Sequence, residues 1–250
     1  MTPVLLLHAF PCAGEMWDAQ AIALSEAGWD VIVPDLPGFG ASDLLDAEPD
    51  LDAVARIVLR ELDEQRIERF IVGGLSLGGY LTMALLRLAH QRIAAVMLCD
   101  TKASADGDAA VANRHRLADA AVANPASCGR MLRQSVLPGL LGPTTFATRP
   151  EVVTRVEGWL DAARPDTVAW YQRAMARRPD SGETLRAVDV PALVLWGDED
   201  ALSTPADHEA MCAVLRQAHP VVIDGSGHLS AVEAPDAVGA AMTAFLNALD

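Results

Sequence analysis

The chain contains 250 residues, of which 51% are hydrophobic, and its 34 acidic and 19 basic side chains give a formal net charge of −15 at pH 7. This length and apolar content fit one large domain of mixed helices and strands, with room for an insertion. The negative charge argues against nucleic acid or an anionic membrane as a partner.

Short apolar segments alternate with helix-like ones through most of the chain. Because the first apolar segment is short and has no basic stretch before it, we expect neither a signal peptide nor a membrane span. Strands are predicted at residues 3–7, 30–34, 69–73, 93–99, 192–196 and 221–223. Helices are predicted at residues 16–27, 51–65, 77–89, 205–216 and 235–249. This alternation predicts an α/β fold with a parallel sheet and right-handed crossovers.

Residues 102–188 interrupt the alternation, because they contain helical segments and no convincing strand. The helical segments are separated by pairs that include Pro138-Gly139 and Gly142-Pro143. A helical insertion between two parallel strands is expected to lie over the strand ends, where ligands bind in such sheets. We therefore predict a core made of residues 1–101 and 189–250 and a helical cap of residues 102–188. The alternative is a long peripheral crossover.

Four cysteines are scattered along the chain and form no Cys-x-x-Cys pair. Their spacing predicts neither a metal site nor a disulfide framework, and it favours a reducing compartment. We therefore expect a cytoplasmic protein.

Residues 70–80 read as an apolar strand, a glycine-flanked corner and the start of a helix. Inside this stretch, Gly74-x-Ser76-x-Gly78 matches the pattern of a nucleophile elbow. A serine that points out of a tight strand-to-helix turn needs a strained backbone and neighbours without side chains. The helix that follows directs its N–H groups towards whatever reacts at the serine. The alternative is an ordinary turn between a strand and a helix.

A serine hydroxyl needs a neighbouring base to act as a nucleophile. Of the six histidines, His228 stands out because it follows the last predicted strand in the glycine-rich turn Asp224-Gly-Ser-Gly-His228. We predict that His228 takes the proton of Ser76 and later returns it to the leaving group. A carboxylate at another strand end must orient the histidine, and Asp100 and the Asp198-Glu199-Asp200 run are candidates.

Five motifs together resemble the α/β-hydrolase family, and the resemblance covers nearly the whole chain outside the predicted cap. They are Gly-Leu-Ser-Leu-Gly, His-Ala-Phe-Pro, Asp-Leu-Pro-Gly-Phe-Gly-Ala-Ser, Trp-Gly-Asp-Glu-Asp and Gly-Ser-Gly-His. The resemblance implies Asp200 as the acid, with Asp100 at an alternative acid position used in part of the family. It also implies an oxyanion hole made by the backbone N–H groups of Phe10 and Leu77.

Two departures from the family pattern carry expectations about the fold. Family members usually have a β-hairpin before the strand that precedes His8, and this chain begins at that strand. We therefore expect about six strands, mostly parallel, with residues 31–33 at an exposed edge that a partner chain of a homo-oligomer or the N-terminus covers. In addition, Ala9 stands where the family often has glycine, so alanine would be strained there if the position needs a positive φ.

These features predict a serine hydrolase that cleaves a small ester or lactone without a metal or an organic cofactor. Short segments around residues 98–103 and 176–181 resemble small carboxylesterases and enol-lactonases. Phe10, Asp100, Trp159 and Trp170 are candidates for lining the substrate pocket, although helix packing is the alternative role for the tryptophans. Perhydrolases or haloperoxidases without a cofactor, and carbon–carbon bond hydrolases, share the same triad. A ligand receptor of the same fold with little turnover is an alternative of another class.

Overall fold

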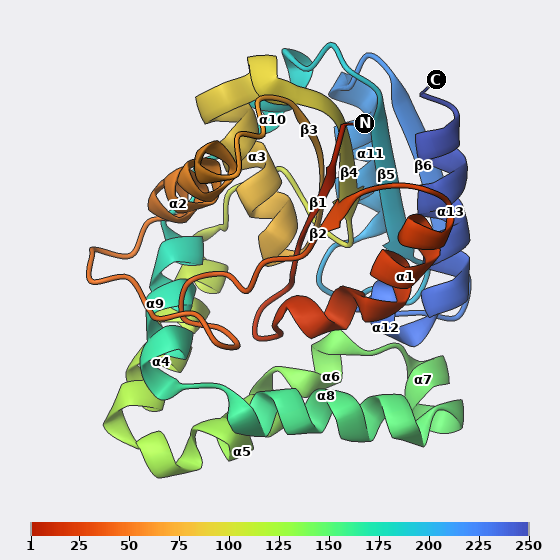
Figure 1. Cartoon of the computed structure of the whole chain (residues 1–250). Helices are drawn as coiled ribbons and strands as arrows, with labels where there is room; N and C mark the ends of the chain where they lie inside the picture. The colour runs from red at the N-terminus through yellow and green to blue at the C-terminus, as the bar shows by residue number, and fades with distance from the viewer. Residues whose placement is uncertain (1, 250) are drawn as a thin grey trace.

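Within residues 2–249, which the computed structural model describes, six strands form one parallel sheet (Figure 1). The strands are β1 (Val4–Leu7), β2 (Val31–Ile32), β3 (Phe70–Leu75), β4 (Ile93–Cys99), β5 (Ala192–Gly197) and β6 (Ala218–Ile223). Their order across the sheet is β2-β1-β3-β4-β5-β6, and every neighbouring pair is parallel. The predicted fold class, including the six strands, is confirmed.

The two outer strands differ from the rest of the sheet. β2 has only two residues and lies at one edge, as expected for residues 31–33, and what covers this edge remains a prediction. β6 begins at Ala218, so His219 lies inside the strand and not before it. By contrast, the residues of β1, β3 and β5 are buried throughout, because helices cover both faces of the sheet there.

Helices pack on both faces of the sheet. One face carries α2 (Leu51–Glu64), α3 (Leu77–Ala89), α10 (Gly182–Arg186) and α11 (Pro205–Val214), which form a continuous layer. The other face carries α1 (Asp18–Glu26) and α13 (Pro235–Asn247), which pack against each other (Figure 1). Short helices precede α1 and α13, namely η1 (Gly14–Trp17) and α12 (Ser230–Glu233). Another, η2 (His90–Arg92), joins α3 to β4.

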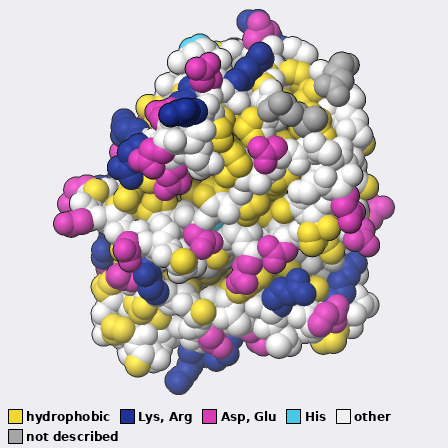
Figure 2. Space-filling model, in the orientation of Figure 1, with side chains coloured by type: hydrophobic (Ala, Val, Ile, Leu, Met, Phe, Trp, Pro, Cys, Tyr) yellow, Lys and Arg dark blue, Asp and Glu magenta, His cyan; other side chains and the backbone are white. Residues whose placement is uncertain are grey.

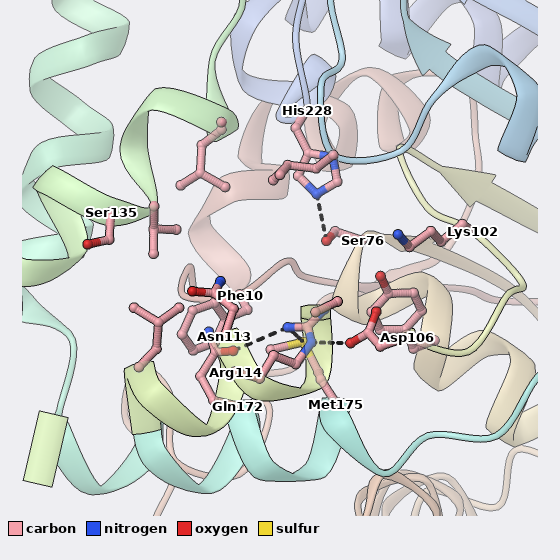
Figure 3. A pocket seen from close by; sticks show the side chains of 17 residues that line it. Phe10, Ser76, Lys102, Asp106, Asn113, Arg114, Ser135, Gln172, Met175 and His228 are labelled. Atoms are coloured by element: carbon pink, nitrogen blue, oxygen red, sulfur yellow. Dashed lines mark hydrogen bonds and ion pairs between the residues drawn. The ribbon is translucent and has the colours of Figure 1, made fainter. Parts of the chain in front are cut away.

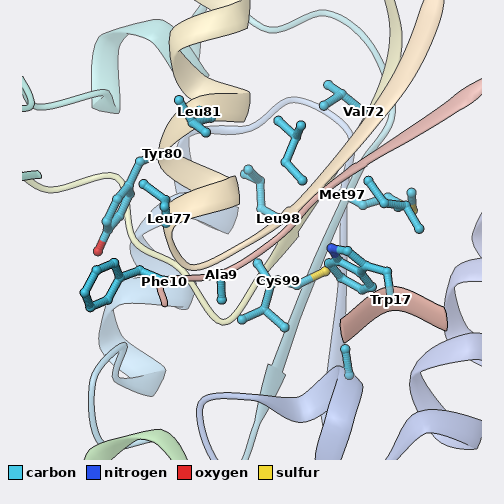
Figure 4. Close-up of a cluster of buried hydrophobic side chains, with 14 of the residues drawn as sticks. Ala9, Phe10, Trp17, Val72, Leu77, Tyr80, Leu81, Met97, Leu98 and Cys99 are labelled. Atoms are coloured by element: carbon cyan, nitrogen blue, oxygen red, sulfur yellow. The ribbon is translucent and has the colours of Figure 1, made fainter. Parts of the chain in front are cut away.

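Apolar side chains of β3, β4 and α3 meet in the buried core. Figure 4 shows Leu77 and Leu81 of α3 against the strands, with Trp17 across the sheet from them. Because α3 begins at Leu77, this packing fixes the position of the residue directly before it, Ser76.

The chain between β4 and β5 is helical, and no strand occurs there within residues 2–249. Apart from α10, its helices lie over the carboxyl ends of the strands (Figure 1). The assignment of residues 102–188 to a cap separate from the core remains a prediction. The helices are α4 (Asp108–Ala123), η3 (Pro125–Ser127), α5 (Cys128–Ser135), α6 (Leu137–Leu140), α7 (Pro143–Thr148), α8 (Pro150–Ala162) and α9 (Pro165–Ala176), followed by α10.

Of the two pairs predicted to separate helices, Gly142-Pro143 does lie between α6 and α7, whereas Pro138-Gly139 lies inside a helix. Pro138 and Gly139 are part of α6, and Pro143 is the first residue of α7 after the N-cap Gly142. The first residues of a helix donate no intrahelical hydrogen bond, so proline is accepted there. The prediction of a break was therefore wrong for Pro138-Gly139.

The surface is charged without a single dominant acidic patch on the face seen in Figure 2, where Asp and Glu side chains alternate with Lys and Arg. Some of these charges form ion pairs, such as Arg92 with Asp63 at 2.8 Å. In the described part of the chain, no helix combines the length and apolar character needed to cross a membrane.

Candidate active site

Ser76 occupies the sharp corner between β3 and α3. Its backbone has φ 54° and ψ −108°, a conformation that costs an L-residue free energy and that recurs at functional sites. Two hydrogen bonds hold the corner, since Ser76 donates its N–H to the carbonyl oxygen of Cys99 at 3.0 Å and accepts from the hydroxyl of Thr101 at 3.0 Å. The turn therefore depends on β4 and the residues after it.

The flanking glycines leave no room for a side chain. A Cβ atom on Gly74 would lie 2.1 Å from the carbonyl oxygen of Gly78, and one on Gly78 would lie 2.0 Å from that of Leu7. Both obstacles are backbone atoms, which cannot rotate away. This close approach of β1, β3 and α3 explains the glycine spacing around Ser76.

Gly78→Ala is expected to destabilise the protein by about 3 kcal/mol or more, because the new methyl group forces β1 and α3 apart. Gly158→Ala is the matched control, since Gly158 lies in α8 and a Cβ there would meet nothing within 4 Å beyond the neighbouring backbone of its own helix. That control should gain up to about 1 kcal/mol from helix propensity. Urea unfolding of both variants measures the difference, and equal stabilities would contradict the steric explanation.

The structure brings Ser76, His228 and Asp200 together from three separate strand ends. His228 Nε2 lies 2.7 Å from Ser76 Oγ, and its Nδ1 lies 2.9 Å and 3.0 Å from the two carboxylate oxygens of Asp200 (Figure 3 shows the first contact). His228 is 5% exposed and Ser76 is half-buried. The serine hydroxyl thus has a base beside it, and the base has a carboxylate behind it.

Asp200 is held as an ionised partner for the imidazole. Its Oδ1 accepts hydrogen bonds from the backbone N–H groups of Leu202, at 2.7 Å, and Ser203, at 3.1 Å, and the Ser203 hydroxyl donates to Oδ2. Burial acts to raise the pKa of Asp200, but the charge and hydrogen bond of His228, together with these donors, lower it below its usual value. A carboxylate in this position fixes the imidazole tautomer with Nδ1 protonated and Nε2 facing the serine.

Asp100 lies close to the site but is enclosed by the backbone. Its side chain accepts from the N–H of Gly197 at 2.9 Å, and from the N–H of Ser230 at 3.1 Å and the Ser230 hydroxyl. It is fully buried, and burial, with the neighbouring charge of Asp200, raises its pKa well above the usual range. The prediction that Asp100 lines the substrate pocket is wrong, because its oxygens are used to join the ends of β4 and β5 to the loop that carries His228.

The backbone N–H groups of Phe10 and Leu77 lie where the sequence predicted oxyanion donors, after β1 and at the first residue of α3. Within residues 2–249, neither N–H has a hydrogen-bond acceptor. His8 supports the Phe10 loop from behind, because its Nδ1 binds the carbonyl of Ala9 at 3.0 Å and its Nε2 accepts from the N–H of Leu36 at 3.0 Å. Burial lowers the pKa of His8 to about 4, so the ring is neutral.

Ala9 shows none of the strain that a positive φ would cause. Among the described residues, the non-glycine positions with positive φ are Arg66, Ser76 and Asp100. Alanine therefore fits the loop without a backbone penalty.

A cavity of about 260 Å³ opens beside Ser76 and lies between the sheet and the inserted helices. Phe10, one of the predicted pocket residues, lines it (Figure 3). The full lining consists of Phe10, Ser76, Tyr80, Lys102, Asp106, Ala110, Asn113, Arg114, Leu117, Ser135, Val136, Gly139, Leu140, Gln172, Met175, Leu202 and His228.

Both tryptophans predicted to face this cavity lie elsewhere. Trp170 is buried against Tyr171, with ring centroids 4.9 Å apart, and its indole N–H donates to the carbonyl of Ala47 at 2.8 Å. Trp159 lines a different hollow, together with Pro11 and Arg164. The prediction was therefore wrong for both residues, and each serves in packing the helices onto the core loops.

The comparisons with known proteins identify the family. A family profile described as the alpha/beta hydrolase fold matches residues 2–235. The chain belongs to the α/β-hydrolase family. A thermophilic esterase from Thermogutta terrifontis, solved with malate bound, superposes with a TM-score of 0.94 at 36% identity, over 100% of this chain and 90% of that one. The enol-lactonase from Burkholderia xenovorans gives a TM-score of 0.87 at 25% identity, over 99% of this chain and 92% of that one.

A relative whose name describes an acetyltransferase component, and not an esterase or lactonase, is also similar over nearly the whole chain. It is the dihydrolipoyllysine-residue acetyltransferase component of the acetoin cleaving system of Pseudomonas putida, 32% identical over 98% of this chain. This α/β hydrolase spans only 63% of that relative's length. The family and the esterase and lactonase neighbours together support hydrolase chemistry.

Glu233 contributes to the site although no sequence pattern singled it out. Its carboxylate accepts from the N–H groups of Gly227 at 2.9 Å and Leu229 at 3.1 Å, on either side of His228, and from the N–H of Gly142 at 2.8 Å. This side chain is 2% exposed. It therefore joins the histidine loop of this α/β hydrolase to the inserted helices. The only signal in the sequence is an acid five residues after the histidine, which is too common to be informative.

A buried charge cluster forms the far wall of the cavity. Asp106 binds both Arg114 and Arg178, and the Arg178 guanidinium lies 2.8 Å from the carboxylate and 4.0 Å above the ring of Tyr80. Burial acts to raise the pKa of Asp106, but the hydrogen bonds and charges of Arg178 and Arg114 lower it to about 2. The cluster ties the segment before α4 to the residues that follow α9. Elsewhere in the described residues, no group of three or more His, Cys, Asp or Glu side chains is placed to hold a metal ion.

Proposed function

We propose that this chain is a serine hydrolase that cleaves a small ester or lactone through an acyl-enzyme on Ser76. The observation that carries the proposal is the continuous chain of contacts from Asp200 to His228 Nδ1 and from His228 Nε2 to Ser76 Oγ, at the mouth of a cavity. Nucleophile, base and orienting acid in hydrogen-bond reach are the requirements for acyl transfer by a serine.

In the first half of the reaction, His228 Nε2 accepts the proton of Ser76 Oγ as this oxygen attacks the substrate carbonyl carbon. The negative charge that develops on the carbonyl oxygen is stabilised by the N–H groups of Phe10 and Leu77. Collapse of the tetrahedral intermediate breaks the bond to the alcohol oxygen. His228 gives its proton to that oxygen, and the acyl group remains on Ser76.

In the second half, a water molecule takes the place of the alcohol. His228 accepts a proton from the water as its oxygen attacks the acyl carbon, and then returns a proton to Ser76 Oγ as the acid leaves. Asp200 stabilises the imidazolium that forms in both halves. A lactone follows the same path, except that the leaving alcohol remains part of the acyl chain and is released with it as one hydroxy acid when the ester on Ser76 is hydrolysed.

The choice of esters and lactones rests on the neighbours and on the cavity. The esterase and the enol-lactonase are similar to this chain over their shared fold, and a cavity of about 260 Å³ suits a small substrate. Perhydrolysis, in which hydrogen peroxide replaces water in the second half, uses the same residues and is compared in the same assay.

The proposal is tested by a serine-directed phosphonate and a panel of substrates. We expect a stable adduct on Ser76 in the mass spectrum of the digested protein, and turnover of p-nitrophenyl acetate or butyrate above that of the octanoate. Turnover of a panel of lactones would identify lactonase activity, and reaction of acetate with hydrogen peroxide would identify perhydrolase activity. An adduct on Ser76 without turnover of any substrate would favour a ligand receptor, and an unmodified Ser76 would contradict an activated nucleophile.

A further inference from the structure

Lys102 is the only lysine among the 250 residues, whose basic side chains are otherwise arginines. It lies two residues after the buried Asp100, just beyond the carboxyl end of β4. This edge of a parallel sheet is where ligands bind in open α/β folds.

The Lys102 side chain lines the same cavity as Ser76 and His228. In Figure 3 its ammonium end is directed into the cavity on the side of Ser76. Lys102 is half-buried, and within residues 2–249 its ammonium has no ion-pair partner and no hydrogen-bond acceptor. A cation in this position interacts with whatever occupies the cavity.

The neighbouring charges do not neutralise Lys102. Among the described residues that line the cavity, Asp106 is the only acidic one, and it is already bound by Arg114 and Arg178. Arg114 is also engaged, with Gln172 at 3.2 Å and Met175 at 3.3 Å. The wall of the cavity therefore carries more positive than negative charge, with one cation free.

The net charge of −15 does not cancel this local effect. At physiological ionic strength, charges on the outer surface are screened over about 8 Å, whereas charges in a partly closed cavity are screened much less. An anion inside the cavity therefore interacts mainly with Lys102 and its neighbours.

We propose that the substrate of this site carries a free carboxylate that pairs with the Lys102 ammonium. The enzyme then acts on esters or lactones that bear such a carboxylate, such as half-esters of dicarboxylic acids, in preference to neutral esters. This inference rests on the proposed function, because the ester or lactone carbonyl has to reach Ser76 while the carboxylate reaches Lys102. A charge-assisted hydrogen bond in a partly desolvated site discriminates strongly against a neutral end group.

The test compares two esters of nearly equal length, p-nitrophenyl pentanoate and the mono-p-nitrophenyl ester of glutaric acid. We expect the wild type to have the higher kcat/KM for the glutarate ester. In Lys102→Met, the ratio of kcat/KM for the glutarate ester to that for the pentanoate ester should fall by at least about tenfold. Lys102→Arg should keep most of the preference. Arg56→Met, which removes an exposed cation on α2, is the control and should leave the ratio unchanged.

A carboxylate on the alcohol part of the ester is tested with p-acetoxybenzoate and its methyl ester. A drop of the corresponding ratio in Lys102→Met for this pair, but not for the glutarate pair, would place the carboxylate on the leaving group and support the proposal. An unchanged ratio for both pairs would overturn it.

Calorimetric binding of glutarate separates this inference from the proposed function. Even if neither ester is hydrolysed, the dianion should bind the wild type, and its Kd should rise by at least about tenfold in Lys102→Met. Hydrolysis of both esters without a charge preference would refute the role of Lys102 and leave the serine hydrolase in place. Equal glutarate affinity of wild type and Lys102→Met, or no binding to either, would refute it independently of turnover.

Discussion

Replacing Ser76 by alanine is expected to lower kcat/KM for ester hydrolysis by roughly 10⁴- to 10⁶-fold, because the acyl-enzyme can no longer form. The contacts around the site remain, since the turn is held by backbone groups of Ser76 and by the donors to Asp200. The loss should appear mainly in kcat and not as a rise in KM. Steady-state kinetics on the best ester of the panel measures it, with phosphonate labelling as a second readout.

The control for folding uses the unusual backbone of the same residue. Alanine keeps the strain of φ 54° at this position, whereas Ser76→Gly relieves it, so we expect Ser76→Gly to be more stable than Ser76→Ala by about 1 kcal/mol. Both variants should be equally inactive. Hydrolysis that persists in a well-folded Ser76→Ala, or that differs between the two variants, would show that the nucleophile lies elsewhere.

The sequence was most informative where backbone geometry restricts the choice of residue. The Gly74-x-Ser76-x-Gly78 spacing reflects contacts with backbone atoms of Leu7 and Gly78 that no side chain tolerates. His228 and Asp200 follow buried strands, and parallel strands bring their carboxyl ends to one edge, so residues far apart in the chain meet there. The inner strands β1, β3 and β5 were recognisable for a related reason, because burial on both faces makes them apolar throughout.

The inserted helices were harder to predict, because their packing is set by tertiary contacts. Trp170 lies on α9, where either side of the helix could have faced the cavity, and it was placed against Ala47 by a hydrogen bond across 123 positions in sequence. Asp106 and Arg178 are likewise far apart in the chain, and nothing in their local sequence indicates that they pair. Lys102 is a different case. The sequence shows that it is the only lysine, but only the structure shows that its side chain lines the cavity beside Ser76.

Asp100 and Asp200 were both compatible with the acid role on sequence, and the structure gives each carboxylate different partners. Asp200 accepts from the imidazole of His228, whereas Asp100 accepts from Gly197 and Ser230. We expect Asp200→Asn to lower kcat by roughly 10³- to 10⁴-fold, because the amide favours the wrong imidazole tautomer and no longer stabilises the imidazolium. The measurement is kcat for the same ester, with thermal unfolding in parallel.

Asp100→Asn is the matched variant, because it makes the same chemical change at the other buried aspartate near the site. Both Asp100 oxygens accept backbone N–H groups, so an amide nitrogen there meets a donor and leaves it unpaired, at a cost of about 1–3 kcal/mol in stability. Its kcat should fall by no more than about tenfold, because His228 keeps its carboxylate partner. A larger loss of kcat in Asp100→Asn than in Asp200→Asn would reverse the assignment of the acid.

The pH dependence of stability provides an independent check of the Asp200 assignment. Because the pKa of Asp200 is lower in the folded protein than its usual value, the ionised carboxylate stabilises the fold at all pH values above that usual value. This stabilisation is lost as the pH falls through the folded-state pKa, since protonation removes the charge that faces His228. Asp200→Asn has no such group, so the difference in Tm between wild type and variant should shrink on acidification. A difference in Tm that stays constant from neutral to acid pH would mean that Asp200 is not held as a carboxylate beside the imidazole. The proposed role of Asp200 in stabilising the imidazolium would then lose its electrostatic basis.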